Sequence, residues 1–200
     1  MIVIDGEMSG VNPQKNSLVS FGAVDFNNPD RTFYEECRVW EGEDAEIDPE
    51  GLAVNGFTEE EVTSPDRQSV EELAQKFYDW MQPIEDKTLC AQNVSLDRLF
   101  INDALHRAKI NYQFGYRTVD VHTTAYADHM RRGLPILQKN DHSGLNLGKN
   151  LNYVGIPEEP RPHNALTGAK SQAEVMSRIL YGKKLLPDFE EFDIPEMFLG

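Results

Sequence analysis

The sequence is poor in cysteine, in basic residues and in long apolar runs. It has only two cysteines among 200 residues, Cys37 and Cys90, which excludes a framework of several disulfide bonds. So few cysteines are typical of a reducing compartment, and we therefore expect a cytoplasmic protein. The apolar run at the N-terminus ends at Asp5, which makes it too short for a signal peptide or a membrane span, so no membrane association is expected.

The scarcity of basic residues leaves a large negative charge. Nineteen basic residues stand against 34 acidic ones, which gives a net charge of −15. Taken alone, this excess argues against non-specific nucleic-acid binding, because contacts to phosphate need positive charge. The charge is uneven, however, with sums of −15 for residues 1–90, +5 for 91–184 and −5 for 185–200. This asymmetry is a reason to look for an anionic partner of the central stretch.

The apolar pattern predicts a single α/β domain at residues 1–184. Strands are expected at 1–5, 16–26 and 31–40, as an antiparallel meander, and shorter strands at 87–91 and 118–121. Helices are expected at 69–81, 95–108, from 121 to about 130, at 145–154 and at 164–181, with short helical pieces within 47–62 and a polar, basic loop at 131–144. Strands followed by alternating helices and strands predict a mixed sheet with helices packed on it.

Residues 185–200 form an acidic C-terminal tail that contains phenylalanine. Its aromatic residues are Phe189, Phe192 and Phe198. Three large apolar side chains favour a tail docked on the domain surface over a free one. The alternative hypothesis is that this tail binds a protein partner.

Four residues are candidates for chemistry. Asp5 and Glu7 point to the same side at the end of the first strand, where two carboxylates raise each other's pKa and would be relieved by a divalent cation. Asp97 lies in the first turn of a helix, and His163 precedes the last helix. Each of these residues alone also has a simpler explanation. Asp5 and Glu7 fit an exposed acidic strand end, Asp97 fits an acid favoured by the helix dipole, and His163 fits a structural histidine.

Together, the segments that contain these residues form an ordered set of motifs. They are DGEMSG at 5–10, IDPEGLAVNGFT at 47–58, AQNVSLD at 91–97 and PHNALTGA at 162–169. In this order and at these spacings, the set resembles the DEDDh 3′–5′ exonuclease family, which includes proofreading exonuclease domains, oligoribonuclease and ribonuclease T. The resemblance covers residues 1–181.

The resemblance implies a fold, a reaction and site residues. It implies a ribonuclease-H-like fold, with a five-stranded mixed sheet whose second strand is antiparallel and which is flanked by helices. It implies two Mg²⁺ or Mn²⁺ ions, and release of nucleoside monophosphates from 3′ ends of single-stranded DNA or RNA. Asp5, Glu7 and Asp97 match metal-binding acids, and His163 matches the general base. Met8 and Ser9 match positions where the family places a wedge and backbone contacts for the terminal nucleotide, and Asn93 is a further candidate for substrate binding.

Gly168 departs from the family pattern. Members of the family usually carry an aspartate five residues after the histidine, and this chain has Gly168 there. Three accounts stay open. Water fills the gap in an active enzyme, another side chain such as Asp120 or His122 reaches in, or the chain binds nucleic acid without cutting it.

The basic loop supplies candidate phosphate contacts. The basic residues in this loop are Arg131, Arg132, Lys139 and His142, and Lys149 lies beside it. They are expected to line the path of a single strand, although an ordinary solvated loop has the same composition. The sequence thus predicts a metal-dependent exonuclease, with a catalytically impaired nucleic-acid-binding or partner-binding module as the alternative. DNA and RNA both stay open as substrates, and so does the oligomeric state.

Overall fold

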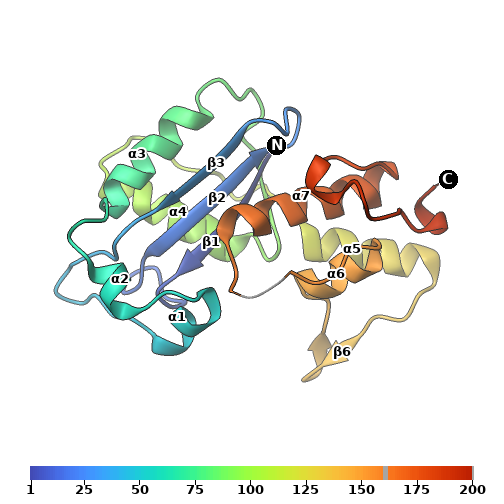
Figure 1. The fold of residues 1–200 in the computed structure, drawn as a ribbon, viewed down its shortest axis with the longest axis horizontal. Coiled ribbons are helices and arrows are strands. Elements are labelled where there is room, and N and C mark those ends of the chain that lie inside the picture. Colours follow the sequence, from blue (N-terminus) through green and yellow to red (C-terminus); the bar gives the residue numbers. More distant parts are fainter. Residues whose placement is uncertain (160–161, 200) are drawn as a thin grey trace.

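A five-stranded mixed sheet forms the centre of the computed structural model, which describes residues 1–159 and 162–199. The strand order is β3-β2-β1-β4-β5 (Figure 1). The strands are β1 (Ile2–Met8), β2 (Leu18–Asp25), β3 (Thr32–Glu36), β4 (Leu89–Ala91) and β5 (Val119–Asp120). β2 runs antiparallel to both β1 and β3, whereas β1, β4 and β5 are parallel. The predicted α/β fold and its antiparallel second strand are confirmed.

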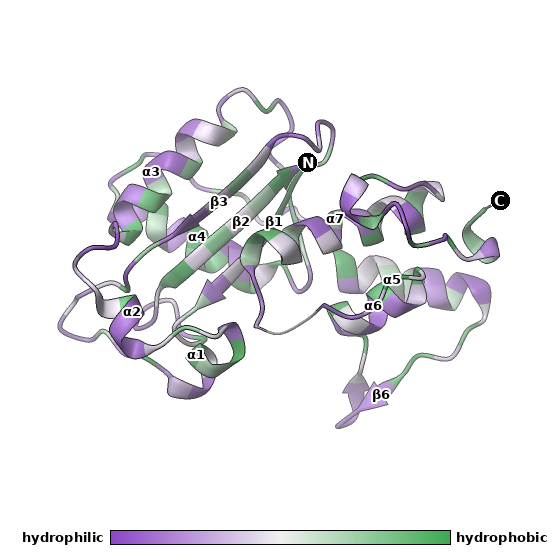
Figure 2. Ribbon diagram, in the orientation of Figure 1, coloured by the Kyte–Doolittle hydropathy of each residue, from purple (hydrophilic) through white to green (hydrophobic). Residues whose placement is uncertain are grey.

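Helices cover both faces of this sheet. α3 (Val70–Met81) and α4 (Ser95–Arg107) pack on one face, while α5 (Val121–Arg132), α6 (Leu147–Tyr153) and α7 (Ala165–Tyr181) pack on the other. Alternation along β1 explains the two layers, because Ile2 and Ile4 join the first core and Val3 joins the second. A strand buried on both faces needs apolar residues at successive positions, and Figure 2 shows this as hydrophobic colour along β1 and β2.

Smaller elements surround the sheet. α1 (Pro49–Asn55) and α2 (Glu59–Thr63) account for the short helical pieces expected within 47–62. The expected polar loop at 131–144 instead contains a hairpin of β6 (Gln138–Lys139) and β7 (His142–Ser143). Its two turn residues, Asn140 and Asp141, both have positive φ, as a tight hairpin turn requires. None of the helices in the described part of the chain combines the length and hydropathy needed to cross a lipid bilayer.

The N-terminal end of α7 packs directly on β2, because residue 22 is a glycine. A Cβ atom on Gly22 would lie 2.2 Å from the carbonyl oxygen of Ala165, which is closer than two such atoms approach. Ala165, Ala169 and Ala173 lie one helical turn apart and are fully buried, so this face of α7 is thin. The position of α7 is therefore determined by its small residues, and with it the place of His163 just before the helix.

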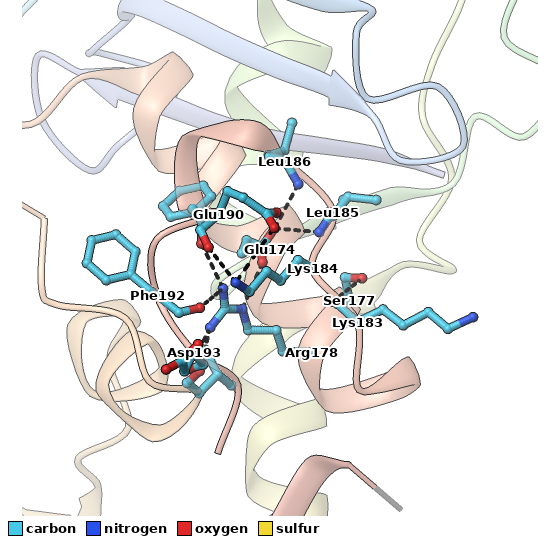
Figure 3. A network of polar contacts seen from close by, with 12 residues as sticks. Glu174, Ser177, Arg178, Lys183, Lys184, Leu185, Leu186, Glu190, Phe192 and Asp193 are labelled. Carbon is cyan, nitrogen blue, oxygen red and sulfur yellow. Dashed lines mark hydrogen bonds and ion pairs between the residues drawn. The ribbon is translucent and has the colours of Figure 1, made fainter. Parts of the chain in front are cut away.

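A buried ion pair attaches the C-terminal segment to the other end of α7. Arg178 and Glu174 are both fully buried, and Arg178 Nε donates to Glu174 Oε1 at 2.8 Å (Figure 3). The other N–H groups of the guanidinium donate to the backbone carbonyls of Val154, Phe189, Phe192 and Asp193. Glu174 Oε2 accepts from the backbone N–H groups of Leu185 and Leu186, at 2.9 and 3.0 Å. The five N–H donors of Arg178 thus all have acceptors.

The expected tail at 185–200 lies on its own domain, apart from Gly200, which is outside the described residues. It contains two short 3₁₀ helices, η1 (Pro187–Phe189) and η2 (Glu196–Phe198). Phe189 and Phe198 are buried in the same core as α5, α6 and α7, and Phe192 packs against that core. These aromatic side chains are therefore used inside the domain, and a protein partner of the tail stays a prediction.

Replacing Arg178 by methionine should lower the free energy of unfolding by about 3–5 kcal/mol, because the Glu174 charge would stay buried without its partner. Lys170→Met is the control, since it breaks the outer ion pair of Lys170 with Asp188 (Nζ to Oδ1, 2.8 Å). That pair is partly solvated and should contribute about 0–1 kcal/mol. Chemical denaturation measures both variants, and equal losses would contradict the role given to Arg178.

Candidate active site

Three acidic residues meet at the carboxyl end of β1. Asp5 and Glu7 alternate with Gly6 along the strand, and the backbone N–H of Gly6 donates to Asp97 Oδ1 at 3.0 Å. Asp97 comes from the first turn of α4, which follows β4, the strand parallel to β1. Glu7 is 9% exposed and Asp97 6% exposed, so two of the three carboxylates are buried. The fold brings together the acids that the motifs predicted.

Burial makes ionisation of these carboxylates costly. It raises the pKa of Glu7 to about 7, and it raises that of Asp97 to about 7 with added repulsion from Glu7 and Asp120. The pKa of Asp5 lies well above its usual range, because the side chain is enclosed and because Asp97, Glu7 and Glu159 repel its charge. Carboxylates that cannot all ionise together would be relieved by a cation placed between them.

The donor set fits a hard divalent cation in its chemistry. Within residues 1–159 and 162–199, no three side chains of Asp, Glu, His or Cys are already gathered into a metal site. Asp5, Glu7 and Asp97 nevertheless offer only carboxylate oxygens, which are the ligands that Mg²⁺ and Mn²⁺ prefer. Their raised pKa values are what a set of acids shows when its charge is not balanced.

A cleft of about 300 Å³ opens beside these acids. Asp5 and Glu7 line one side, and His163, Glu159 and Gln172 line it from α7 and the segment before that helix. Asn164 caps α7 by accepting hydrogen bonds from the backbone N–H groups of Leu166 and Thr167, so the helix starts immediately after His163. The cap fixes His163 immediately before the N-terminus of α7, where it lines the same cleft as Asp5 and Glu7.

Gly168 lies in contact with Asp5. A Cβ atom at residue 168 would be 2.1 Å from Asp5 Oδ2, so the Asp5 carboxylate occupies the space next to this position of α7. One turn further along the helix, Gln172 Nε2 donates to Asp5 Oδ1 at 2.8 Å, and its Oε1 accepts from the backbone N–H of Gln92 at 2.6 Å. The helix face that would carry a fourth carboxylate therefore offers a neutral amide.

The candidates to replace the missing acid are used elsewhere. Asp120 caps α5 by accepting from the backbone N–H of Thr123 at 2.7 Å, and it also accepts from that of Val94 at 3.1 Å. His122 lines a different cavity. Sequence reasoning missed Glu159, which lies four residues before His163 and lines the cleft. Its pKa is raised by burial, partly offset by a hydrogen bond from Ser171 and by His163.

Met8 and Ser9 differ in their surroundings. Ser9 is fully buried, and its Oγ accepts from the backbone N–H of Ser17 at 3.0 Å. This side chain holds the loop after β1, and the expected backbone contact of Ser9 with a terminal nucleotide stays a prediction. Met8 is half-buried against the first core, and its backbone carbonyl accepts from Asn55 Nδ2 at 3.2 Å. Asn55 thus ties α1 to the end of β1, beside Glu7.

Two of the basic residues that were expected to line the path of a single strand lie in a second cavity of about 470 Å³. Asn93, Lys139 and His142 line this cavity, which the hairpin β6–β7 walls on one side. It adjoins the first cleft, since Asn146 lines both. Lys149 instead pairs with Glu158 (Nζ to Oε1, 3.0 Å).

Arg131 and Arg132 lie at the far end of α5. Both pair with Asp128, at 2.6 and 2.8 Å, and the Arg132 guanidinium stacks 4.7 Å from the ring centre of Phe198. α5 begins at the site edge and is about 18 Å long, so its last turn is distant from the cleft. Arg132, which also donates to the backbone carbonyl of Met197, helps to attach the C-terminal segment, whereas Arg131 pairs with Asp128 on its own helix. The expected binding of substrate by these two arginines stays a prediction.

Comparison with known proteins identifies the family of the chain. A family model described as exonuclease, of the RNase T type, matches residues 2–176. The chain belongs to this exonuclease family. Its structural neighbours include a DEDDh family member, so the resemblance drawn from the motifs is confirmed. A search of curated proteins found no significant sequence match to this exonuclease.

Three solved structures illustrate the likeness in fold. The zinc-bound E. coli exonuclease I complex with single-stranded DNA has a TM-score of 0.71 and 16% identity, over 90% of this chain and 40% of that one. The nuclease domain of 3′hExo, a DEDDh family member bound to rAMP, has a TM-score of 0.66 and 18% identity, over 92% and 93%. Cell-death related nuclease 4 has a TM-score of 0.69 and 14% identity, over 92% and 64%. This exonuclease thus spans two fifths of exonuclease I and nearly all of the 3′hExo domain.

The contact between Gly168 and Asp5 predicts an unusual result for an alanine in a helix. Alanine normally stabilises a helix interior by about 1 kcal/mol relative to glycine. Gly168→Ala should instead destabilise the protein by about 1–3 kcal/mol, because the new Cβ displaces the Asp5 carboxylate from Gln172. Gly51→Ala in α1 is the control, since its Cβ would meet no atom nearer than 3.5 Å and should stabilise the protein. Thermal denaturation measures both, and a stabilised Gly168→Ala would argue against the contact.

The raised pKa of Asp97 predicts a dependence of stability on pH in the metal-free protein. Asp97 binds its proton more tightly when folded, so its contribution is favourable at about pH 4 and is lost as the pH rises through about 7. Asp97→Asn keeps an acceptor for the Gly6 N–H without the charge. We expect this variant to melt at a higher temperature than the wild type near pH 8, with the difference vanishing near pH 4. A constant difference across this range would contradict the assignment.

Proposed function

We propose that this exonuclease is metal-dependent and releases nucleoside monophosphates stepwise from the 3′ ends of single-stranded DNA or RNA. The observation that carries the proposal is the placement of Asp5, Glu7 and His163 around one cleft, with Asp97 hydrogen-bonded to β1 between the two acids. Supporting structures include exonuclease I with single-stranded DNA and a 3′-exonuclease that recognises the 3′ end of a histone mRNA stem-loop.

Each residue would have a separate part in the reaction. Asp5, Glu7 and Asp97 would hold Mg²⁺ or Mn²⁺. The bound ions would activate the attacking water and stabilise the leaving 3′ oxygen. His163, which lines the same cleft, would accept the proton of that water, a role that suits an imidazole near neutral pH. Gln172 would keep the Asp5 side chain in place through its hydrogen bond.

The rest of the strand would follow the second cavity. Asn93, Lys139 and His142 line it, and Asn146 joins it to the cleft, so a single strand whose 3′ end is in the cleft would pass the hairpin β6–β7. Lys139 supplies the positive charge that attracts a phosphate backbone. The two buried free cysteines fit the predicted reducing, cytoplasmic location, which stays a prediction.

A binding module without catalysis is the second candidate function. It is favoured by one observation, the contact of Gly168 with Asp5, which leaves α7 without the family's fourth acid. Such a module would bind a 3′ end in the same cleft and release nothing. Product analysis distinguishes the two functions.

The test is cleavage of a 5′-labelled single-stranded oligonucleotide, DNA and RNA in turn, with Mg²⁺, with Mn²⁺ and with a chelator. We expect a ladder that shortens from the 3′ end and requires a divalent ion. His163→Ala should slow cleavage by about 10²–10⁴-fold, the usual contribution of a general base. Asp5→Asn should slow it at least as much.

The control for His163→Ala is His106→Ala, an exposed histidine on α4 away from the cleft, which should leave the rate unchanged. Oligonucleotide binding with no cleavage under any of these conditions would favour the binding module. Cleavage that survives both Asp5→Asn and the chelator would refute the proposed mechanism.

A further inference from the structure

The cleft contains a carboxylate that the family motif does not. Glu159 lies in the segment between α6 and α7 and lines the cleft with Asp5, Glu7 and His163. The motif residues alone leave three acids, because the fourth position is Gly168. Glu159 is therefore a candidate for the missing acid, and this inference rests on the proposed function.

The face of α7 toward the cleft cannot itself restore the fourth acid. At residue 168 the Asp5 carboxylate already occupies the space of a side chain, 2.1 Å from where a Cβ would be. At residue 172, one turn further, the buried glutamine amide is committed to Asp5 on one side and to the backbone of Gln92 on the other. A fourth carboxylate must therefore come from another element.

Glu159 is held at this same face of α7. The Ser171 hydroxyl donates a hydrogen bond to Glu159 Oε1, and Ser171 is itself 1% exposed. Residues three apart on a helix are neighbours, so Ser171 lies next to Gly168. The bond therefore keeps the Glu159 carboxylate close to the position where relatives carry the aspartate.

The adjacent glutamate has different partners. Glu158 also lines the cleft, but its Oε1 accepts from Lys149 Nζ and from Asn152 Nδ2, both at 3.0 Å. Its charge is thus already matched by a lysine on α6. The two glutamates share a segment and a cleft, and differ in whether α6 or α7 holds them.

We propose that Glu159 supplies the fourth carboxylate of the site, replacing from the preceding segment the aspartate that is absent at residue 168. Together with Asp5, Glu7 and Asp97 it would balance the charge of two divalent ions, and it would do so from a side chain anchored by Ser171. Gly168 is then part of a rearranged site, in which the Asp5 carboxylate occupies the space next to residue 168 and the fourth acid comes from outside the helix.

Calorimetric titration of the full-length protein with Mn²⁺ tests this role without substrate. Glu159→Gln keeps the shape of the side chain and an acceptor for Ser171, and it removes the charge. We expect its affinity for Mn²⁺ to fall by at least about tenfold, because mutating even a residue that only hydrogen-bonds to a metal ligand typically lowers metal affinity by about that factor. Cleavage of the labelled oligonucleotide should fall in parallel. Glu158→Gln, the matched control, should change the affinity by less than about threefold.

Ser171→Ala tests the anchor, and a smaller loss of Mn²⁺ affinity than in Glu159→Gln is expected. A cooperative thermal unfolding transition in each variant shows that it is folded. If the wild type binds Mn²⁺ and cleaves, but Glu159→Gln titrates like the wild type, the role of Glu159 is overturned and the proposed function stands. If the wild type neither binds Mn²⁺ nor cleaves, both fail together.

Discussion

The close packing of α7 on β1 and β2 is the constraint on which the rest of this structure depends. It is possible because α7 presents alanines to the sheet, and because Gly22 leaves room for the helix backbone. The first turns of the helix then bring Gly168 and Gln172 against Asp5 and hold His163 at the cleft. Its last turns bury Arg178, which binds the C-terminal segment. One rigid helix thus positions both the candidate site and the end of the chain.

The charges of the chain divide into a site that lacks compensation and pairs that are complete. Buried Glu7 and Asp97, beside Asp5, repel one another, so the metal-free site is less stable near neutral pH than the same shape without charge would be. At the other end of α7, the buried charge of Glu174 is matched by Arg178. The pair of Glu174 and Arg178 needs no charge from outside, whereas the charges of the acids beside the cleft would be relieved by a cation.

Much of the fold could be predicted because its signals are local. The apolar periods of β1, α3 and α7 lie within short stretches of chain, and the structure reproduces those elements with shifts at their ends. The pairing of Asp5 with Glu7 followed from strand alternation alone. Other contacts are not local, and the sequence did not show them. Arg131 and Arg132 pair with Asp128, Arg132 also lies against Phe198, and Ser9 Oγ accepts a hydrogen bond from Ser17, so their expected contacts with substrate stay predictions.

The sequence by itself determined the family, the order of the motifs and three of the acids, since these depend on residue types at set spacings. The tertiary structure alone decided which other side chains lie beside these acids. The bond between Gln172 and Asp5 joins residues 167 positions apart, and Glu159 reaches the cleft from a segment with no motif. Such contacts depend on how closely α7 approaches β1. That distance is set by the packing of small residues from several strands and helices, and no local spacing along the chain encodes it.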